Sequence, residues 1–239
     1  NLFLLSPTLW LKKFLIFFYP QVIFSILWVV FLKAKNFLII FSKTITSFLE
    51  RLFAFILLLL LSPVFVILYL LVYLTSPGPF LFKQKRAGKD KKPFTIYKIR
   101  TMIVNAEKLK SKVKNEADGP VFKNFNDPRF TKIGRTISRL GLDELPQLVN
   151  IVKGEMSFVG PRPLPLDEAE KIPQEYQKRF AVKPGIFSSW VASGCFHDDF
   201  KKWMMLDIKD VNNKSFFYDL KVAFKSLSFV LKLFKKFLW

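Results

Sequence analysis

The chain has 239 residues, of which 51% are apolar, and its 38 Lys and Arg against 18 Asp and Glu give a formal net charge of +20. This length suffices for one compact domain with attached membrane segments, and it excludes two large domains. The joint excess of apolar and basic residues excludes an ordinary soluble enzyme and a disordered basic tail. Because the basic residues flank long apolar runs and no nucleic-acid recognition module is visible, we expect membrane lipids and no nucleic acid as partners.

The first predicted element is an amino-terminal hydrophobic membrane segment, residues 1–42. Within it, Phe14 to Leu32 is an uncharged run bracketed by lysines. A run of this length spans the hydrocarbon core of a bilayer. A cleaved signal peptide has a shorter apolar region and a small-residue cleavage site, so we expect an anchor helix.

The second predicted membrane element is residues 43–76, in which Ser62-Pro63 interrupts a long apolar run. A proline inside a helix removes one backbone hydrogen bond and clashes with the carbonyl of Leu59, at a cost of about 3 kcal/mol, so we expect a bend. The Ser62 hydroxyl is the nearest group that can replace the lost bonding. Basic residues flank both ends of the run, which favours a re-entrant helix, although a kinked spanning helix is the commoner use of proline in membranes.

From residue 77 the composition becomes charged and rich in turns, which indicates a domain outside the membrane, residues 77–215. Sequence patterns predict two short strands and three helices, near Phe80–Gln84, Phe94–Ile99, Ile103–Val113, Thr131–Arg139 and Leu145–Lys153. The single cysteine, Cys195, cannot form an internal disulfide, which fits a reducing cytoplasmic compartment.

The last predicted element, residues 216–239, is a basic amphipathic interfacial helix. Its lysines share one helical face, and its aromatic and aliphatic side chains lie largely opposite. The alternative is an ordinary surface helix packed on its own domain. The basic bias and the terminal Trp239 favour membrane contact.

The clearest candidates for chemistry are two adjacent carboxylates, Asp143 and Glu144. Pro146 fits only the first turn of a helix, so Asp143 is expected at or beside an N-cap, where backbone N–H groups favour its ionised form. An ionised carboxylate can attack phosphorus, and Glu144 can hold a hard cation such as Mg²⁺. On these residues alone, simple helix capping remains an alternative.

Basic residues near predicted turns are candidate phosphate contacts. The clearest is Arg162, because Pro161 and Pro163 present its guanidinium from a stiff backbone. The remaining candidates are Arg86, Lys98, Arg100 and Arg135. A diphosphate and a phosphate-headed lipid both need such neutralisation, although many surface cations are simply solvated. The single histidine, His197, excludes a multi-histidine metal site, and no Walker loop or dinucleotide glycine fingerprint is present.

The ordered motifs resemble the bacterial sugar transferases, the monotopic polyprenyl-phosphate phosphoglycosyl transferases. The resemblance extends from about residue 50 to residue 221. It rests on Ser62-Pro63, Ser76-Pro77-Gly78-Pro79, Gln84 with Arg86 and Gly88, Lys92-Pro93-Phe94, Tyr97-Lys98-Ile99-Arg100-Thr101-Met102, Asp127-Pro128-Arg129, Ile133-Gly134-Arg135, Leu142-Asp143-Glu144-Leu145-Pro146-Gln147 and Val159-Gly160-Pro161-Arg162-Pro163.

The resemblance implies a small α+β catalytic domain on the cytoplasmic face of a bacterial inner membrane, seated by a re-entrant helix and interfacial helices. It implies a ping-pong reaction in which Asp143 attacks the β-phosphate of a UDP-sugar, UMP leaves, and polyprenyl phosphate accepts the phosphosugar. This would be the first membrane step of surface glycan assembly. Glu144 matches the family's Mg²⁺ ligand, and the phosphate-binding role of Arg162 is our inference. The sugar and any homo-oligomeric state stay open.

The carboxy-terminal half departs from the family pattern. Threonine, glutamine and arginine of the common Pro-Gly-Ile-Thr-Gly-Leu-Trp-Gln-Val-Ser-Gly-Arg motif are replaced by Phe187, Val191 and Cys195, while Asp210 and Lys214 stand where tyrosine and tryptophan are usual. These changes indicate an altered donor pocket or reduced activity. One alternative is therefore a weakened relative that acts as a membrane-bound assembly partner, although retention of Asp143, Glu144 and Arg162 argues against it. A second is a basic lipid- or nucleic-acid-binding protein without chemistry.

Overall fold

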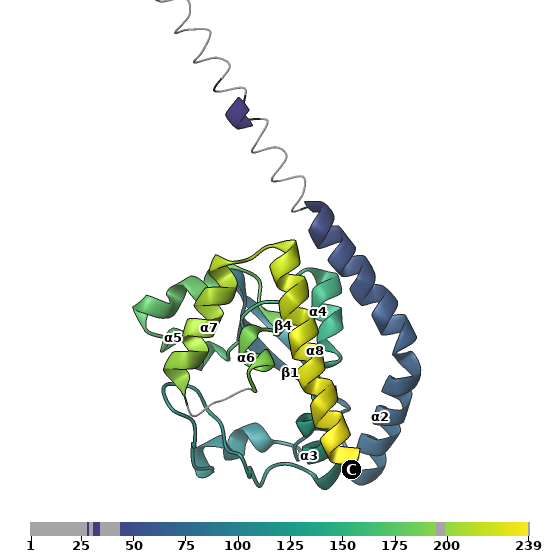
Figure 1. Cartoon of the computed structure of the whole chain (residues 1–239). Coiled ribbons are helices and arrows are strands. Elements are labelled where there is room, and N and C mark those ends of the chain that lie inside the picture. The colour runs from purple at the N-terminus through teal and green to yellow at the C-terminus, as the bar shows by residue number, and fades with distance from the viewer. Residues whose placement is uncertain (1–27, 29–30, 34–43, 195–198, 239) are drawn as a thin grey trace, which may run out of the picture. The chain divides into compact units, whose positions relative to one another are not determined.

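The computed structural model describes residues 28, 31–33, 44–194 and 199–238 (Figure 1). The chain divides into two compact units, Asn1–Phe48 and Leu49–Trp239. The predicted anchor falls almost wholly outside the described residues. All elements that position the candidate site belong to the second unit.

A bent pair of helices, Thr44–Leu60 and α2 (Ser62–Thr75), precedes the sheet elements, with an angle of 58° at the break. Pro63 lies in the first turn of α2, where its missing N–H is tolerated. The Ser62 hydroxyl donates to the Leu59 carbonyl at 2.8 Å. The bend and this bond agree with the predictions. Within the described part of the chain, no single helix has the length and apolar composition to cross a bilayer, whereas this pair together meets both criteria.

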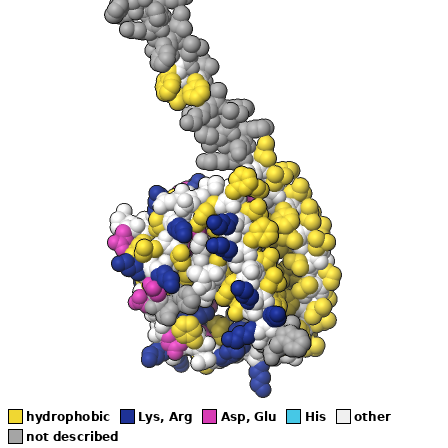
Figure 2. All heavy atoms as spheres, in the orientation of Figure 1, with side chains coloured by type: hydrophobic (Ala, Val, Ile, Leu, Met, Phe, Trp, Pro, Cys, Tyr) yellow, Lys and Arg dark blue, Asp and Glu magenta, His cyan; other side chains and the backbone are white. Residues whose placement is uncertain are grey.

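The bent pair has one face against the domain and one exposed face. Ala54, Leu68 and Val72 are buried, and the last two pack in a cluster with Ile99 and Ile137. The other face carries large exposed apolar side chains, which gather along the right-hand side of Figure 2. They include Leu52, Phe53, Phe55, Ile56, Leu59, Leu60, Val66, Ile67, Tyr69, Leu70, Leu71, Tyr73 and Leu74. A contiguous apolar patch of this kind marks an interaction surface.

The first strands form an antiparallel hairpin, β1 (Leu81–Ala87) and β2 (Pro93–Ile99), joined through the 3₁₀ turn η1 (Lys89–Lys91). Both strands were predicted, although β1 begins and ends later than expected because its pairing continues to Ala87 opposite Pro93. Alternate residues of a strand share a face. Phe94 and Ile96 are buried on one face of β2, and Lys98 follows on the same face. The strand therefore directs a lysine toward the core side.

Further helices and a second small sheet complete the fold. The elements are η2 (Ala106–Lys112), α3 (Lys132–Arg139), η3 (Leu142–Glu144), α4 (Gln147–Lys153), β3 (Ser157–Val159), α5 (Leu166–Glu170), η4 (Gln174–Ala181), β4 (Gly185–Phe187), α6 (Ser189–Ala192), α7 (Phe200–Asn212) and α8 (Phe216–Leu238). β3 and β4 are parallel neighbours. Helices and small sheets together give an α+β fold, as expected.

Two predicted helices differ from those observed. The segment predicted as a helix from Ile103 is a 3₁₀ helix that begins only at Ala106, because Asn105 adopts a left-handed conformation. The helix predicted from Leu145 begins at Gln147. The elements from β3 to α7 had no counterpart in the prediction.

The carboxy-terminal helix α8 packs on its own domain and also exposes apolar side chains. Val222 and Ser226 are buried, and the Ser226 hydroxyl donates to the Ser188 carbonyl at 3.1 Å. The exposed apolar residues of α8 include Phe216, Phe217, Leu220, Phe224, Leu227 and Leu231. One face of α8 therefore packs on the domain, as expected for an ordinary surface helix. Contact of its exposed apolar face with a membrane remains a prediction.

Gly134 brings α3 against the end of β2. A Cβ atom there would overlap the Thr101 backbone carbonyl, whereas a Cβ on Gly141 meets nothing within 4 Å. We predict that Gly134→Ala lowers the free energy of unfolding by about 3 kcal/mol. That corresponds to a fall in melting midpoint of about 6–12 °C in detergent.

The matched control is Gly141→Ala, which costs about 1 kcal/mol because the left-handed conformation is strained for alanine. Equal melting midpoints for the two variants would contradict the close approach of α3 to Thr101.

Candidate functional site

Asp143 and Glu144 lie in the short turn η3 rather than at the start of a helix. Gly141, with a φ of 70°, precedes the turn, and the Glu144 amide donates to the Gly141 carbonyl at 3.2 Å. The N-cap position of α4 is Pro146, and no side chain caps it. The prediction that Asp143 occupies or adjoins the N-cap of the helix ending near Gly154 is therefore wrong, because Asp143 lies in a separate turn that begins after the left-handed Gly141 and ends before α4.

Two cations hold the acid pair. Lys98 Nζ lies 3.2 Å from Asp143 Oδ2 and 2.8 Å from Glu144 Oε1. Arg162 Nη1 lies 2.8 Å from the same Glu144 oxygen. These four side chains, which we call the charged quartet, come from β2, η3 and the loop after β3. The quartet places residues distant in the sequence around one shared carboxylate.

The two carboxylates of the quartet have opposite pKa shifts. Burial raises the pKa of Asp143, and Lys98 only partly opposes this shift. Burial also disfavours ionised Glu144, but Arg162 and Lys98 outweigh it and bring the pKa of Glu144 well below its usual range. Glu144 is thus the fixed negative charge, and Asp143 is the more basic carboxylate. The ionised form of Asp143 was expected to be stabilised by the backbone N–H groups at a helix terminus. In the structure Lys98 stabilises it instead.

The loop from Pro161 to Pro163 presents Arg162 from a firmly bound backbone. The Pro161 carbonyl accepts from the Gly185 amide at 3.1 Å, and the Pro163 carbonyl accepts from Arg86 Nη1 at 3.0 Å. Burial and the neighbouring Arg162 lower the pKa of Arg86 to about 10. Arg86 therefore lies beside the loop that carries Arg162, and contact of these residues with phosphate remains a prediction.

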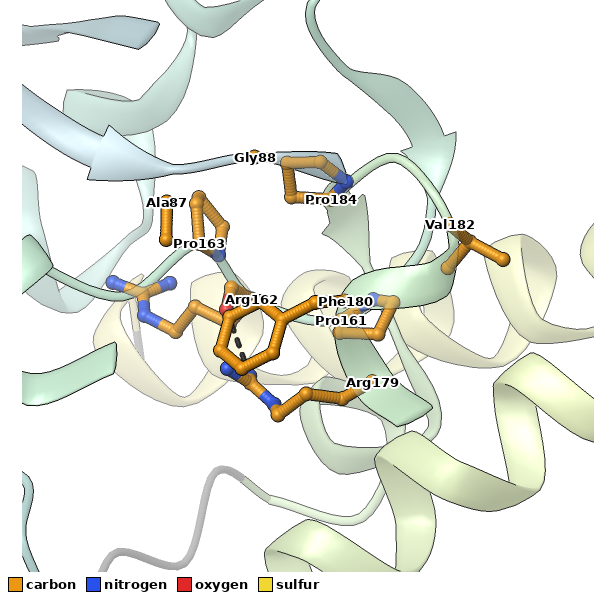
Figure 3. A pocket seen from close by; sticks show the side chains of 9 residues that line it. All are labelled: Ala87, Gly88, Pro161, Arg162, Pro163, Arg179, Phe180, Val182 and Pro184. Carbon is orange, nitrogen blue, oxygen red and sulfur yellow. Dashed lines mark hydrogen bonds between the residues drawn. The ribbon is translucent and has the colours of Figure 1, made fainter. Parts of the chain in front are cut away.

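A small hollow lies behind this loop (Figure 3). Its volume is about 10 Å³, room for about one water molecule. A nucleotide sugar is far larger than this hollow. The accessible edge of the quartet is instead Arg162, whose side chain is 29% exposed.

The structure does not bring Arg100 and Arg135 into the quartet. The Arg100 guanidinium donates to the Pro79 carbonyl at 2.6 Å and to the Ser76 hydroxyl at 2.7 Å, and also contacts the Ser76 carbonyl. It therefore fixes the turn between α2 and β1. Arg135 donates to the Asp127 carbonyl at 3.0 Å. These two predicted phosphate contacts are used by the protein's own backbone.

The donor set of the quartet fits Mg²⁺ only together with a bound phosphate. Contacts of Asp143 and Glu144 to cations use one oxygen of each carboxylate, and each has a second oxygen. No group of three or more His, Cys, Asp or Glu side chains suited to a metal occurs within the described residues. Mg²⁺ is commonly held by one or two carboxylates plus substrate phosphates, which matches this pair.

Two of the residues that depart from the family pattern have partners inside the fold. Asp210 accepts hydrogen bonds from the Ser189 amide and the Tyr218 hydroxyl, both at 2.8 Å. Lys214 donates to the Val159 carbonyl at 2.6 Å. Phe187 and Val191 are partly buried, and Cys195 lies outside the described residues.

Sequence reasoning missed the buried ion pair between Arg179 and Asp207. Arg179 Nη2 lies 2.7 Å from Asp207 Oδ2, and the two side chains are 1% and 0% exposed. A signal was present in α7, where Asp207 shares a helical face with the buried Trp203 and Met204. A carboxylate among apolar residues at this spacing indicates a buried partner.

A profile described as bacterial sugar transferase matches residues 41–233. The chain is 41% identical over 157 residues to the galactosyl transferase CpsE of Streptococcus agalactiae, a match that covers 64% of this chain and 35% of that protein. It is 34% identical over 201 residues to the undecaprenyl-phosphate galactose phosphotransferase of Salmonella typhimurium, covering 80% of this chain and 42% of the relative.

A third relative is the UDP-glucose:undecaprenyl-phosphate glucose-1-phosphate transferase of Escherichia coli. Identity is 37% over 179 residues, which cover 72% of this chain and 37% of the relative. The matched region thus spans less than half the length of these three relatives.

Proposed function

The chain belongs to the bacterial sugar transferase family, and we propose that it transfers a sugar 1-phosphate from a UDP-sugar to polyprenyl phosphate, with release of UMP. The names of two relatives, from Salmonella typhimurium and Escherichia coli, specify undecaprenyl phosphate and a sugar-phosphate transfer. The observation that carries the proposal is the acid pair held against Lys98 and Arg162. A buried carboxylate beside cations suits attack on a phosphate.

In the proposed first step, an Asp143 oxygen attacks the β-phosphorus of the donor. The bond from that phosphorus to the bridging oxygen breaks, and UMP leaves with the electron pair. In the second step, a phosphate oxygen of polyprenyl phosphate attacks the same phosphorus, and the Asp143 carboxylate is released. In this mechanism Lys98 limits the pKa of Asp143, and Arg162 would neutralise phosphate charge.

Glu144, with Asp143, would hold Mg²⁺ against the diphosphate. When bound, the cation would neutralise phosphoryl oxygens and increase the electrophilicity of phosphorus. The low pKa of Glu144 suits this role, since the carboxylate stays ionised across the physiological range.

A panel of UDP-sugars with polyprenyl phosphate and Mg²⁺, read by UMP release, tests the activity. Turnover with one member identifies the sugar. Failure of every member, with the protein folded and in membranes, would favour the weakened assembly partner over the active enzyme.

We predict that Asp143→Asn abolishes both turnover and covalent capture, because an amide is a poor nucleophile. Mass spectrometry of the unmodified protein with donor alone should show a phosphosugar adduct on Asp143. Glu144→Gln should lose most activity together with its dependence on Mg²⁺.

The matched acid-to-amide control is Asp167→Asn, at a side chain that is 61% exposed and pairs with Lys110. It should leave turnover unchanged. The covalent mechanism is wrong if no adduct forms and UMP release requires the lipid acceptor.

A second prediction concerns the pH dependence of kcat/KM. Burial raises the pKa of Asp143 and Lys98 lowers it, so Lys98→Met should raise this pKa further. Activity requires ionised Asp143 and falls as pH drops through its pKa. The acidic limb of the profile should therefore move to higher pH in Lys98→Met.

Lys153→Met, at a lysine that is fully exposed to solvent and bonded to the Tyr97 hydroxyl, is the control and should leave the limb in place. An acidic limb at the same pH in Lys98→Met and the unmodified enzyme would show that Lys98 does not govern Asp143.

We also propose that the domain lies on the cytoplasmic face of a bacterial inner membrane, with the bent pair re-entrant and α8 at the interface. The exposed apolar faces of the bent pair and of α8 support this proposal. So do the basic residues on both sides of the apolar run, which favour one and the same membrane face for its two ends.

Replacing Ser62 and Pro63 together by Leu should restore a continuous spanning helix and lower activity, because the domain would leave the side that holds the donor. Single cysteines at Ser47 and Pro77, in a Cys195→Ser background, report the topology through an impermeant maleimide. Labelling of both positions from one face is expected for the native Ser62-Pro63 pair. Labelling from opposite faces would refute re-entry.

A further inference from the structure

The backbone of the loop after β3, together with the last residue of β3, is bound by side-chain cations from β1, from η4 and from the segment between α7 and α8. Lys214 donates to the Val159 carbonyl at 2.6 Å, and Arg86 donates to the Pro163 carbonyl at 3.0 Å. Between them, Arg179 Nη2 donates to the carbonyl of Arg162 itself at 2.9 Å, the dashed contact in Figure 3. The loop therefore has little freedom to shift relative to the domain.

Arg179 is in turn fixed by a carboxylate on α7. Its Nε and Nη2 lie 3.0 Å and 2.7 Å from Asp207 Oδ2, in a pair that is almost wholly buried. Replacing such a pair with apolar residues is often neutral or stabilising, so fold stability does not by itself explain it. The same Nη2 atom contacts both Asp207 and the Arg162 carbonyl, and this shared atom connects the buried pair to the site.

A second connection runs from α7 to the Arg162 side chain. Trp203 on α7 stacks on Trp190 with ring centroids 4.5 Å apart. The Arg162 guanidinium, which forms the ion pair with Glu144, lies 5.8 Å from the Trp190 ring centroid. Helix α7 thus supports the backbone of Arg162 through one path and its guanidinium through another.

We infer that Arg179, oriented by Asp207, is a positioning residue that holds Arg162 in register with Glu144. The inference rests on the proposed function, because it assigns Arg162 to the reacting phosphate. Planar arginine is suited to this task, since its fork contacts a carboxylate and a carbonyl at once. Outer partners that orient a reacting group commonly change activity by about 10–100-fold when removed.

The test uses the full-length protein in membranes with the double variant Arg179→Met/Asp207→Leu, which removes both charges and leaves neither one buried alone. We expect kcat to fall about 10–100-fold with a smaller change in KM, because Arg162 remains present but misplaced. The melting midpoint should stay near that of the unmodified protein. Arg139→Met, at an exposed arginine of α3, is the matched control and should change neither kcat nor KM.

A second readout does not need activity. Phenylglyoxal modifies accessible guanidinium groups, and mass spectrometry reports its rate at Arg162. In the double variant this rate should rise several-fold, while Arg139→Met leaves it unchanged. Arg179→Lys keeps the charge beside Asp207 without the planar fork, so it should also raise the rate.

Unchanged kcat and an unchanged Arg162 modification rate in a folded double variant would overturn the inference. If the double variant does not fold, Arg179→Lys decides, and a rate equal to that of the unmodified protein overturns it. Absence of turnover with every UDP-sugar would instead reject the proposed function. The modification rate would still test whether Arg179 positions Arg162.

Discussion

The Glu144 carboxylate is the point on which the site depends. A single oxygen, Oε1, lies 2.8 Å from both Lys98 and Arg162, so one acid holds a strand, a turn and a loop together. Each of these charges would be costly to bury alone, and their mutual pairing compensates the desolvation. Burial raises the pKa of Asp143 and Lys98 opposes this only in part, whereas Arg162 and Lys98 together bring the pKa of Glu144 below its usual range. The two adjacent carboxylates therefore have different properties.

The bent pair of helices and the quartet are connected through the same strand, β2. Ile99 of β2 packs with Leu68 and Val72 of α2, while Ile96 packs with the core around α4. Lys98 lies between Ile96 and Ile99 in the sequence of β2, and its amino group contacts Asp143 and Glu144. A change in how α2 meets the domain would therefore move β2 and, with it, Lys98. If the bent pair enters a bilayer as proposed, this shared core fixes the depth of the acid pair relative to the lipid headgroups.

The parts of the fold that could be predicted are those determined by local backbone restrictions and by the spacing of apolar residues. Pro63 cannot lie in the interior of a regular helix and alternating apolar residues indicate β2, so the bend and this strand were both predicted. The three-residue strands β3 and β4 carry too short a pattern to detect.

The site could be predicted only in part, because residue type does not reveal the partner. The acid pair and Arg162 were recognised from a motif, whereas the environment of Asp143 depends on burial by distant residues. Arg100 looked like a phosphate contact but binds the Ser76 turn.

Lys214 and Asp210, which replace aromatic residues usual in the family, bind Val159 and Ser189 respectively. A buried Asp210 without donors would destabilise the fold, and its bonds to Ser189 and Tyr218 prevent this. Lys214 donates to Val159, the last residue of β3, directly before the loop that carries Arg162, so the carboxy-terminal half supports the backbone next to the site.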